Sequence, residues 1–258
     1  MKFRTMLLAS SAAMFVAGSA SALDLSNPFG VAGEGNFSSD TKIQTTRTEY
    51  KKDMGKFDST SIYEELEYGV NDNFSLLASI QNDFDTEKEF NNDHNFTYGV
   101  GFSYFTTQDN WLMQFTGMYR TSNPKDYYGK DYDARWHKFL NGDIKIGYDM
   151  GDGLIPYMSY ALDGAIDTAD RYLDQSVFAG FHKDNGSWAS NAGFRYDYTT
   201  DKTNKNAMYV QAELSYYPAD NLSVGVYGDY FLGGTLYDYD DIEQDKDYTA
   251  GLRVKYAF

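Results

Sequence analysis

The chain contains no cysteine and only four prolines among its 258 residues. The lack of cysteine excludes a disulfide framework. No run after the first 22 residues reaches the roughly 18 uninterrupted apolar residues of a membrane-spanning helix, so such a helix is excluded there. Basic residues are also scarce, because 22 lysines and arginines stand against 38 aspartates and glutamates. This acidic balance argues against nucleic acid as a partner.

The first residues have the pattern of a secretory signal peptide. Lys2 and Arg4 precede a mostly apolar stretch, residues 6–16, and Ala20-Ser21-Ala22 supplies the small residues of a cleavage site. We therefore expect residues 1–22 to be a signal peptide and residues 23–258 to form a single domain outside the cytoplasm.

Apolar and polar residues alternate along much of the remaining chain. The pattern is clearest over residues 208–217 and 222–231, which are separated by the turn sequence Pro218 to Asn221, and it predicts a β-hairpin. An aromatic content of 17% also favours strands. The same reading predicts twelve strands, at residues 42–51, 59–70, 74–85, 94–107, 111–122, 136–150, 155–167, 174–183, 188–200, 208–217, 222–231 and 248–258. For the first of these, the pattern leaves open which side faces inward.

The connections between these strands are of two kinds. Tight turns are expected at residues 71–73, 108–110, 151–153, 184–187 and 218–221. They alternate with longer polar connections, such as residues 123–133 and 233–247. An even number of strands with this alternation predicts an all-β fold, a closed antiparallel transmembrane β-barrel with short periplasmic turns and long outer loops. A soluble two-sheet sandwich is the alternative, but it does not explain the alternation.

Aromatic residues gather beside the short turns. Phe74, Trp111 and Trp188 directly follow such turns, and Tyr148 and Tyr216 directly precede them. With Phe258 they are expected to form a girdle at the membrane interface, which amphipathic rings favour.

The last strand presents apolar residues at alternate positions up to the final phenylalanine: Leu252, Val254, Tyr256 and Phe258. With the signal peptide, the alternating strands and the two kinds of connection, the chain resembles the bacterial outer-membrane β-barrel proteins. The resemblance implies a location in the outer membrane of a Gram-negative bacterium, in contact with lipid and lipopolysaccharide. It also implies that these four residues are an assembly signal read by the barrel-assembly machinery.

Two kinds of outer-membrane enzyme, a phospholipase and a protease, are alternatives to a channel. Arg135 to Gly142 faintly resembles the His-x-Ser-Asn-Gly stretch of outer-membrane phospholipase, but the nucleophilic serine is missing. A protease of the omptin type would need paired aspartates and an Asp-His pair, for which Asp131, Asp133 and His137 are the candidates. Aspartates are common in solvated outer loops, however, so we expect no catalysis.

An acidic run near the end of the chain raises the question of calcium binding. The acidic residues 237–247 lack the sixth-position glycine and the terminal glutamate of a calcium-hand loop. No metal or cofactor is therefore expected.

The alternation places charged side chains in the barrel lumen. The predicted lumen-lining residues are Glu65, Glu67, Asp83, Arg120, Asp143, Lys145, Asp163, Arg195, Asp197, Glu213, Asp229, Arg253 and Lys255. Charges inside a barrel need water or partners. Eight of these residues are acids and five are bases, which predicts a mild preference for cations.

The sequence thus favours a porin-like channel for passive diffusion of small hydrophilic solutes. The alternative is a structural or surface-interaction barrel whose lumen is plugged by paired side chains.

Overall fold

The computed structural model describes residues 27–50, 56–85, 94–123, 137–166, 173–199, 206–235 and 244–258, and these residues form twelve strands. The strands are β1 (Phe37–Tyr50), β2 (Lys56–Asn71), β3 (Phe74–Asp85), β4 (His94–Gln108), β5 (Trp111–Asn123), β6 (His137–Tyr148), β7 (Leu154–Ala165), β8 (Leu173–Asp184), β9 (Trp188–Thr199), β10 (Asn206–Ala219), β11 (Leu222–Thr235) and β12 (Gln244–Ala257). Within these ranges, no helix has the length and apolar character needed to cross a membrane.

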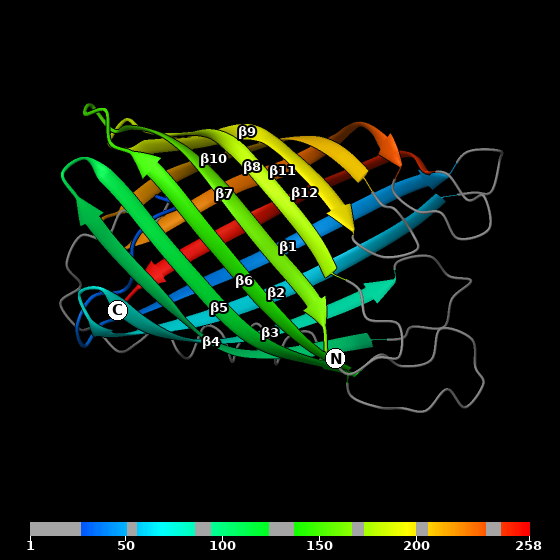
Figure 1. The fold of residues 1–258 in the computed structure, drawn as a ribbon, viewed down its shortest axis with the longest axis horizontal. Coiled ribbons are helices and arrows are strands. Elements are labelled where there is room, and N and C mark those ends of the chain that lie inside the picture. Colours follow the sequence, from blue (N-terminus) through cyan, green and yellow to red (C-terminus); the bar gives the residue numbers. More distant parts are fainter. Residues whose placement is uncertain are drawn as a thin grey trace.

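The twelve strands form one closed antiparallel barrel (Figure 1). Every strand pairs with its neighbours in sequence, and β1 pairs with β12, with Ser38 opposite Ala257. The Phe258 amide then donates a hydrogen bond of 2.8 Å to the Phe37 carbonyl. This closure confirms the predicted fold class and strand number.

Five tight connections lie together at one end of the barrel (Figure 1). They join β2 to β3, β4 to β5, β6 to β7, β8 to β9 and β10 to β11. Asp109 occupies the two-residue turn between β4 and β5 with a φ of 54°, a conformation that aspartate and asparagine tolerate better than most side chains. The predicted turns are therefore confirmed. The other connections, the long loops of the prediction, lie outside the described residues, as do the predicted signal peptide and the start of its domain.

The side chains alternate between the lumen and the outside, as the period of two requires. On β11, Val224 and Val226 are exposed outward, while Ser223, which directly precedes Val224 on the same strand, is buried. Outward residues of the other strands are also mostly large and apolar. The barrel thus presents an apolar belt to its surroundings, which is the surface that lipid requires.

Aromatic rings border this belt at both ends. At the short-turn end Trp111 packs on Tyr148 and Trp188 packs on Tyr216, with ring centroids 5.2 Å and 4.7 Å apart. Toward the other end, outward tyrosines recur on several strands: Tyr98, Tyr119, Tyr196 and Tyr230. Two girdles enclosing an apolar band are typical of barrels that span a bilayer.

The structure extends the first and last predicted strands. β1 begins at Phe37 rather than at residue 42, and β12 begins at Gln244 rather than at residue 248. Residues 37–41 lack a clear apolar alternation, but their backbone pairs on both sides, with β2 and with β12. The register also decides the orientation that the sequence left open, because Asp40 lies opposite Glu65 and Lys255 on the inward face.

We expect the folded protein to migrate on a denaturing gel as a compact species until it is boiled, because a closed barrel has no unpaired edge strand. Replacing Leu252 and Val254 by proline removes two backbone donors from β12 and should abolish the compact band. Identical mobility before and after boiling of the unmodified protein, or a circular dichroism spectrum dominated by helix, would contradict the closed barrel.

Candidate functional site

The barrel encloses a cavity of about 880 Å³. All twelve strands contribute side chains to its wall, and residues 27–31 contribute from the segment before β1. A second cavity of about 260 Å³ lies against β5, β6 and β7. The lumen is therefore the candidate functional site.

The predicted lumen residues divide between the two cavities and the inward wall. Nine line the larger cavity: Glu65, Glu67, Asp143, Lys145, Arg195, Glu213, Asp229, Arg253 and Lys255. Arg120 and Asp163 line the smaller one, together with Asp143. Asp83 and Asp197 line neither cavity but accept hydrogen bonds from the inward Ser61 and Ser176. The register therefore places all thirteen on the inward face.

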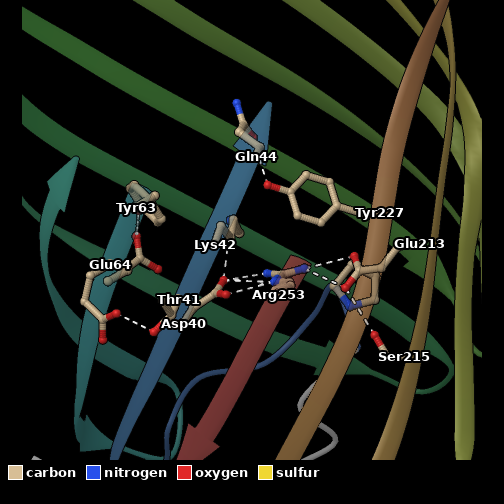
Figure 2. A network of polar contacts seen from close by, with 12 residues as sticks. Asp40, Thr41, Lys42, Gln44, Tyr63, Glu64, Glu213, Ser215, Tyr227 and Arg253 are labelled. Carbon is tan, nitrogen blue, oxygen red and sulfur yellow. Dashed lines mark hydrogen bonds and ion pairs between the residues drawn. The ribbon is translucent and has the colours of Figure 1, made fainter. Parts of the chain in front are cut away.

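The strongest group of ionic contacts lies at the seam between β12 and β1 (Figure 2). The Arg253 guanidinium donates to both carboxylate oxygens of Asp40, with Nη2 to Oδ2 at 2.6 Å, and to both oxygens of Glu213 at 3.0 and 3.2 Å. Lys42 lies 3.4 Å from Asp40. One half-buried arginine thereby links β1, β10 and β12 through charge-assisted hydrogen bonds.

The sequence missed two members of this group, Asp40 and Lys42. Both lie in β1, whose inward side the alternation did not reveal. Once the strand is paired, Asp40 stands opposite Lys255 and Lys42 opposite Arg253 on β12. The only sequence signal was the alternation of charged and neutral residues between positions 40 and 42.

A second ionic group joins β9, β10 and β11. Arg195 contacts Asp197 at 3.0 Å and Asp229 at 3.1 Å, and its guanidinium carbon lies 4.3 Å from the centre of the Tyr209 ring. The Tyr209 hydroxyl donates to Asp247 at 3.1 Å. These contacts hold the Arg195 side chain against the barrel wall.

Two further cations are paired on the opposite wall. Arg120 donates to Asn141 and to Asp163, both at 2.6 Å, and Lys145 lies 3.3 Å from Asp143. The Arg120–Asp163 pair links β5 to β7 across β6, and the Lys145–Asp143 pair joins neighbouring inward positions on β6. Ion pairs thus link inward side chains on this wall as well as at the seam.

Three charged residues of the larger cavity make no ion pair shorter than 4 Å with any described residue: Glu65, Glu67 and Lys255. Glu65 accepts a hydrogen bond of 2.5 Å from the Tyr63 hydroxyl, and Glu67 accepts from the Ser38 hydroxyl at 3.1 Å. Six acids and five bases line this cavity in all. Its charge is therefore nearly balanced, with a small acidic excess on β2.

The sequence did not predict that residues 27–35, here called the strap, enter the short-turn end of the lumen. Phe29, Val31 and Ala32 in the strap are among the most buried apolar residues described, each with at most 5% of its surface exposed. Gln114 on β5 binds the Gly30 backbone from both sides, accepting from its amide at 3.2 Å and donating to its carbonyl at 3.1 Å. The barrel wall thus binds the strap through its backbone.

Contacts from β2 to β7 hold the strap across the lumen. Its Ala32 amide donates to Glu67 on β2 at 3.1 Å, and Lys145 on β6 donates to the Pro28 carbonyl at 3.3 Å. The Phe29 ring packs edge-on against Tyr157 of β7, with centroids 5.7 Å apart. Because β2 and β7 lie five strands apart in a barrel of twelve, the strap crosses most of the opening.

The strap approaches the barrel wall most closely at Gly69 of β2. A Cβ atom at this glycine would lie 1.7 Å from the Gly33 carbonyl oxygen, so only glycine allows the two backbones to pack this closely. The Gly35 amide also donates to the Gly69 carbonyl at 2.9 Å. A glycine-rich sequence directly before the first strand was the available signal for this segment.

The residues considered for catalysis are not assembled in the described part of the chain. His137 lies on β6 opposite Ser122 of β5, while Asp131 and Asp133 lie outside the described residues. No cluster of three or more histidines, aspartates and glutamates suited to a metal ion occurs within the described ranges.

We expect Arg253→Met to lower the free energy of unfolding by about 3 kcal/mol, because it leaves Asp40 and Glu213 without their shared cation. Urea titration of protein refolded into vesicles measures the change. The matched control is Lys246→Met, since Lys246 is 51% exposed and pairs with Glu49 at 2.9 Å near the outer end. The Lys246→Met change should lower the free energy of unfolding by about 1 kcal/mol or less. An equal loss in both variants would contradict the central role of the contacts that Arg253 makes with Asp40 and Glu213.

No protein-family model matches this sequence, and a search of curated proteins found no match either. Solved structures do resemble it. The COG4313 outer-membrane channel from Pseudomonas putida F1 superposes with a TM-score of 0.63 at 10% identity, over 90% of this chain and 98% of that one. The NanC porin gives 0.56 at 11% identity, over 84% and 98%. The translocator domain of autotransporter NalP from Neisseria meningitidis gives 0.50 at 9% identity, over 98% and 94%.

At these identities the likeness concerns the fold alone. The chain has the fold of bacterial outer-membrane β-barrel proteins, which confirms the resemblance predicted from the sequence. The predicted location, the outer membrane of a Gram-negative bacterium, agrees with this fold.

Proposed function

We propose that the protein is an outer-membrane channel that lets small hydrophilic solutes diffuse passively, with a mild preference for cations. The observation that carries the proposal is the 880 Å³ cavity inside a closed barrel, lined by six acids and five bases. A barrel without water in it would be expected to fill its interior with well-packed side chains, because charges are costly to bury.

The fold supports the same function without naming a solute. The two structures with the higher TM-scores quoted above are called a channel and a porin, and both share the arrangement of the barrel with this chain. A third structure, an autotransporter domain, shows that the fold also serves other roles. The proposed function therefore depends on the residues that line the lumen of this chain.

The strap makes the proposed passage narrow. It contacts β2, β5, β6 and β7 at the short-turn end, which faces the periplasm in barrels of this type. This observation also favours the second candidate function, a structural or surface-interaction barrel with a plugged lumen. Single-channel recording of the refolded protein in a planar bilayer separates the two, since measurable conductance supports the channel and its absence supports the plugged barrel.

We expect Gly69→Ala to raise single-channel conductance. Its new methyl group would displace the strap backbone at Gly33, which otherwise narrows the passage. Gly142→Ala on β6 is the matched control, because a Cβ atom there meets nothing closer than 4.0 Å. Both variants should remain heat-modifiable. Equal conductance in the two folded variants would show that the strap does not limit permeation.

Selectivity should depend on Glu65 and Glu67, the acids of the larger cavity that lack a nearby cation. We expect reversal potentials in a salt gradient to report cation preference, and replacement of both residues by glutamine to weaken it. With a Debye length of about 8 Å at physiological salt, charges on a narrow wall act across the lumen. Glu49→Gln near the outer end is the control. Anion preference in the unmodified protein would contradict the assignment.

The assembly role of Leu252, Val254, Tyr256 and Phe258 remains part of the proposal. The register supports one aspect of it, because β12 is the strand that closes the barrel on β1. Contact with lipopolysaccharide and with the barrel-assembly machinery, and the absence of catalysis, are likewise predictions.

A further inference from the structure

The outward face of β1 and β2 differs from the rest of the apolar belt. Here the outward side chains include three hydroxyls and a carboxylate: Thr41, Thr45, Thr60 and Glu64. Thr41 donates to the Glu64 carboxylate, as Figure 2 shows, and the Thr45 and Thr60 hydroxyls lie 3.3 Å apart. We call these four residues the polar patch.

The polar patch lies at the depth of the lipid hydrocarbon. Toward the short-turn end of the barrel, Phe37 and Tyr68 pack with ring centroids 4.7 Å apart. Toward the opposite end, Arg47 pairs with Asp58 at 2.6 Å. The ten steps from Phe37 to Arg47 rise about 25 Å along a strand tilted by about 40°, which matches the apolar band of such barrels. Along β2, Glu64 lies four residues from Tyr68 and six residues from Asp58, which places it near the middle of the membrane.

A carboxyl group in this position needs more partners than its own chain supplies. A carboxylate has about four acceptor sites, and in this barrel Glu64 receives one hydroxyl, that of Thr41. Lipid tails donate no hydrogen bonds, and polar residues at this depth usually mark a contact with protein. The remaining sites of Glu64 therefore call for donors from another protein surface.

The residues beside the polar patch favour close approach. Ala250 on β12 stands next to Thr45, and Ala78 on β3 stands next to Leu66 of β2. Small residues let two membrane-embedded backbones come near each other, and hydroxyls form hydrogen bonds across such contacts. A row of small outward residues continues from Ala250 through Gly228, Ala212 and Ala192 on the adjoining strands, whereas Ile144 occupies the outward face of the distant β6.

We propose that the outward face of β1 and β2 binds a second copy of this chain. The patch is self-complementary, because a protonated Glu64 carboxyl both donates and accepts a hydrogen bond, and Thr41 lies beside it at the same depth. Copies inserted in the same direction can pair about a twofold axis along the membrane normal, which brings equal depths together. Each Glu64 then lies opposite the Glu64 and Thr41 of the other copy, and the two carboxyl groups can form hydrogen bonds across the axis. This inference rests on the membrane-spanning fold and is independent of channel activity.

Cysteine cross-linking tests the proposal directly, because the chain has no cysteine of its own. Ile43→Cys places a thiol beside the polar patch, and Ile144→Cys places one on β6, five strands away. Both isoleucines are outward and 47% exposed, so they form a matched pair. In phosphatidylcholine vesicles at high lipid-to-protein ratio, copper-phenanthroline oxidation should give a disulfide-linked dimer for Ile43→Cys and monomer for Ile144→Cys.

The role of Glu64 is tested in the Ile43→Cys background. Glu64→Leu removes the acceptor and should lower the dimerisation constant about tenfold, whereas Glu64→Gln keeps an acceptor oxygen and should retain the dimer. Heat-modifiability verifies that each variant is folded. Equal cross-linking at positions 43 and 144, or none at 43, would overturn the proposal. A cross-link formed only in native membranes, to a different protein, would also overturn it.

Discussion

The structure depends first on the absence of hydrogen-bonding water in the lipid bilayer. Backbone amides and carbonyls at that depth must find partners within the protein, and a sheet satisfies them only when its first and last strands join. Here β1 and β12 make this closure over a register that runs from Ser38 opposite Ala257 to Tyr50 opposite Gln244. The outward apolar belt, the polar lumen and the inward or outward side of each described strand residue follow from that closed ladder.

Closure also explains why the seam carries the strongest ionic group. Arg253 and Asp40 are 213 residues apart in the chain, and their bidentate contact exists only when the barrel is closed. Glu213 ties the same guanidinium to β10. Hydrogen bonds to charged groups contribute more than neutral ones, so the seam is reinforced where the two ends of the chain meet.

The lumen and the outer face use polar groups in different ways. Inside, most of the described cations are paired on the wall and the strap crosses the short-turn end, so Glu65, Glu67 and Lys255 are the cavity charges without an ion pair to a described residue. Outside, Glu64 is the neighbour of Glu65 in sequence but faces the lipid with Thr41. Two adjacent glutamates on one strand thus face the polar lumen on one side and the apolar outer belt on the other, because side chains alternate along a strand.

The sequence by itself determined the number of strands, the tight turns and the inward side of Glu65, Arg195 and Arg253, because a period of two and turn residues are local properties. It did not reveal the start of β1, the inward position of Asp40 or the strap. These depend on pairing between distant segments: β12 sets the register of β1, and Gln114 and Gly69 hold the strap. The tertiary structure alone also assembled the polar patch, because Thr41 and Glu64 become neighbours only through the register of β1 and β2.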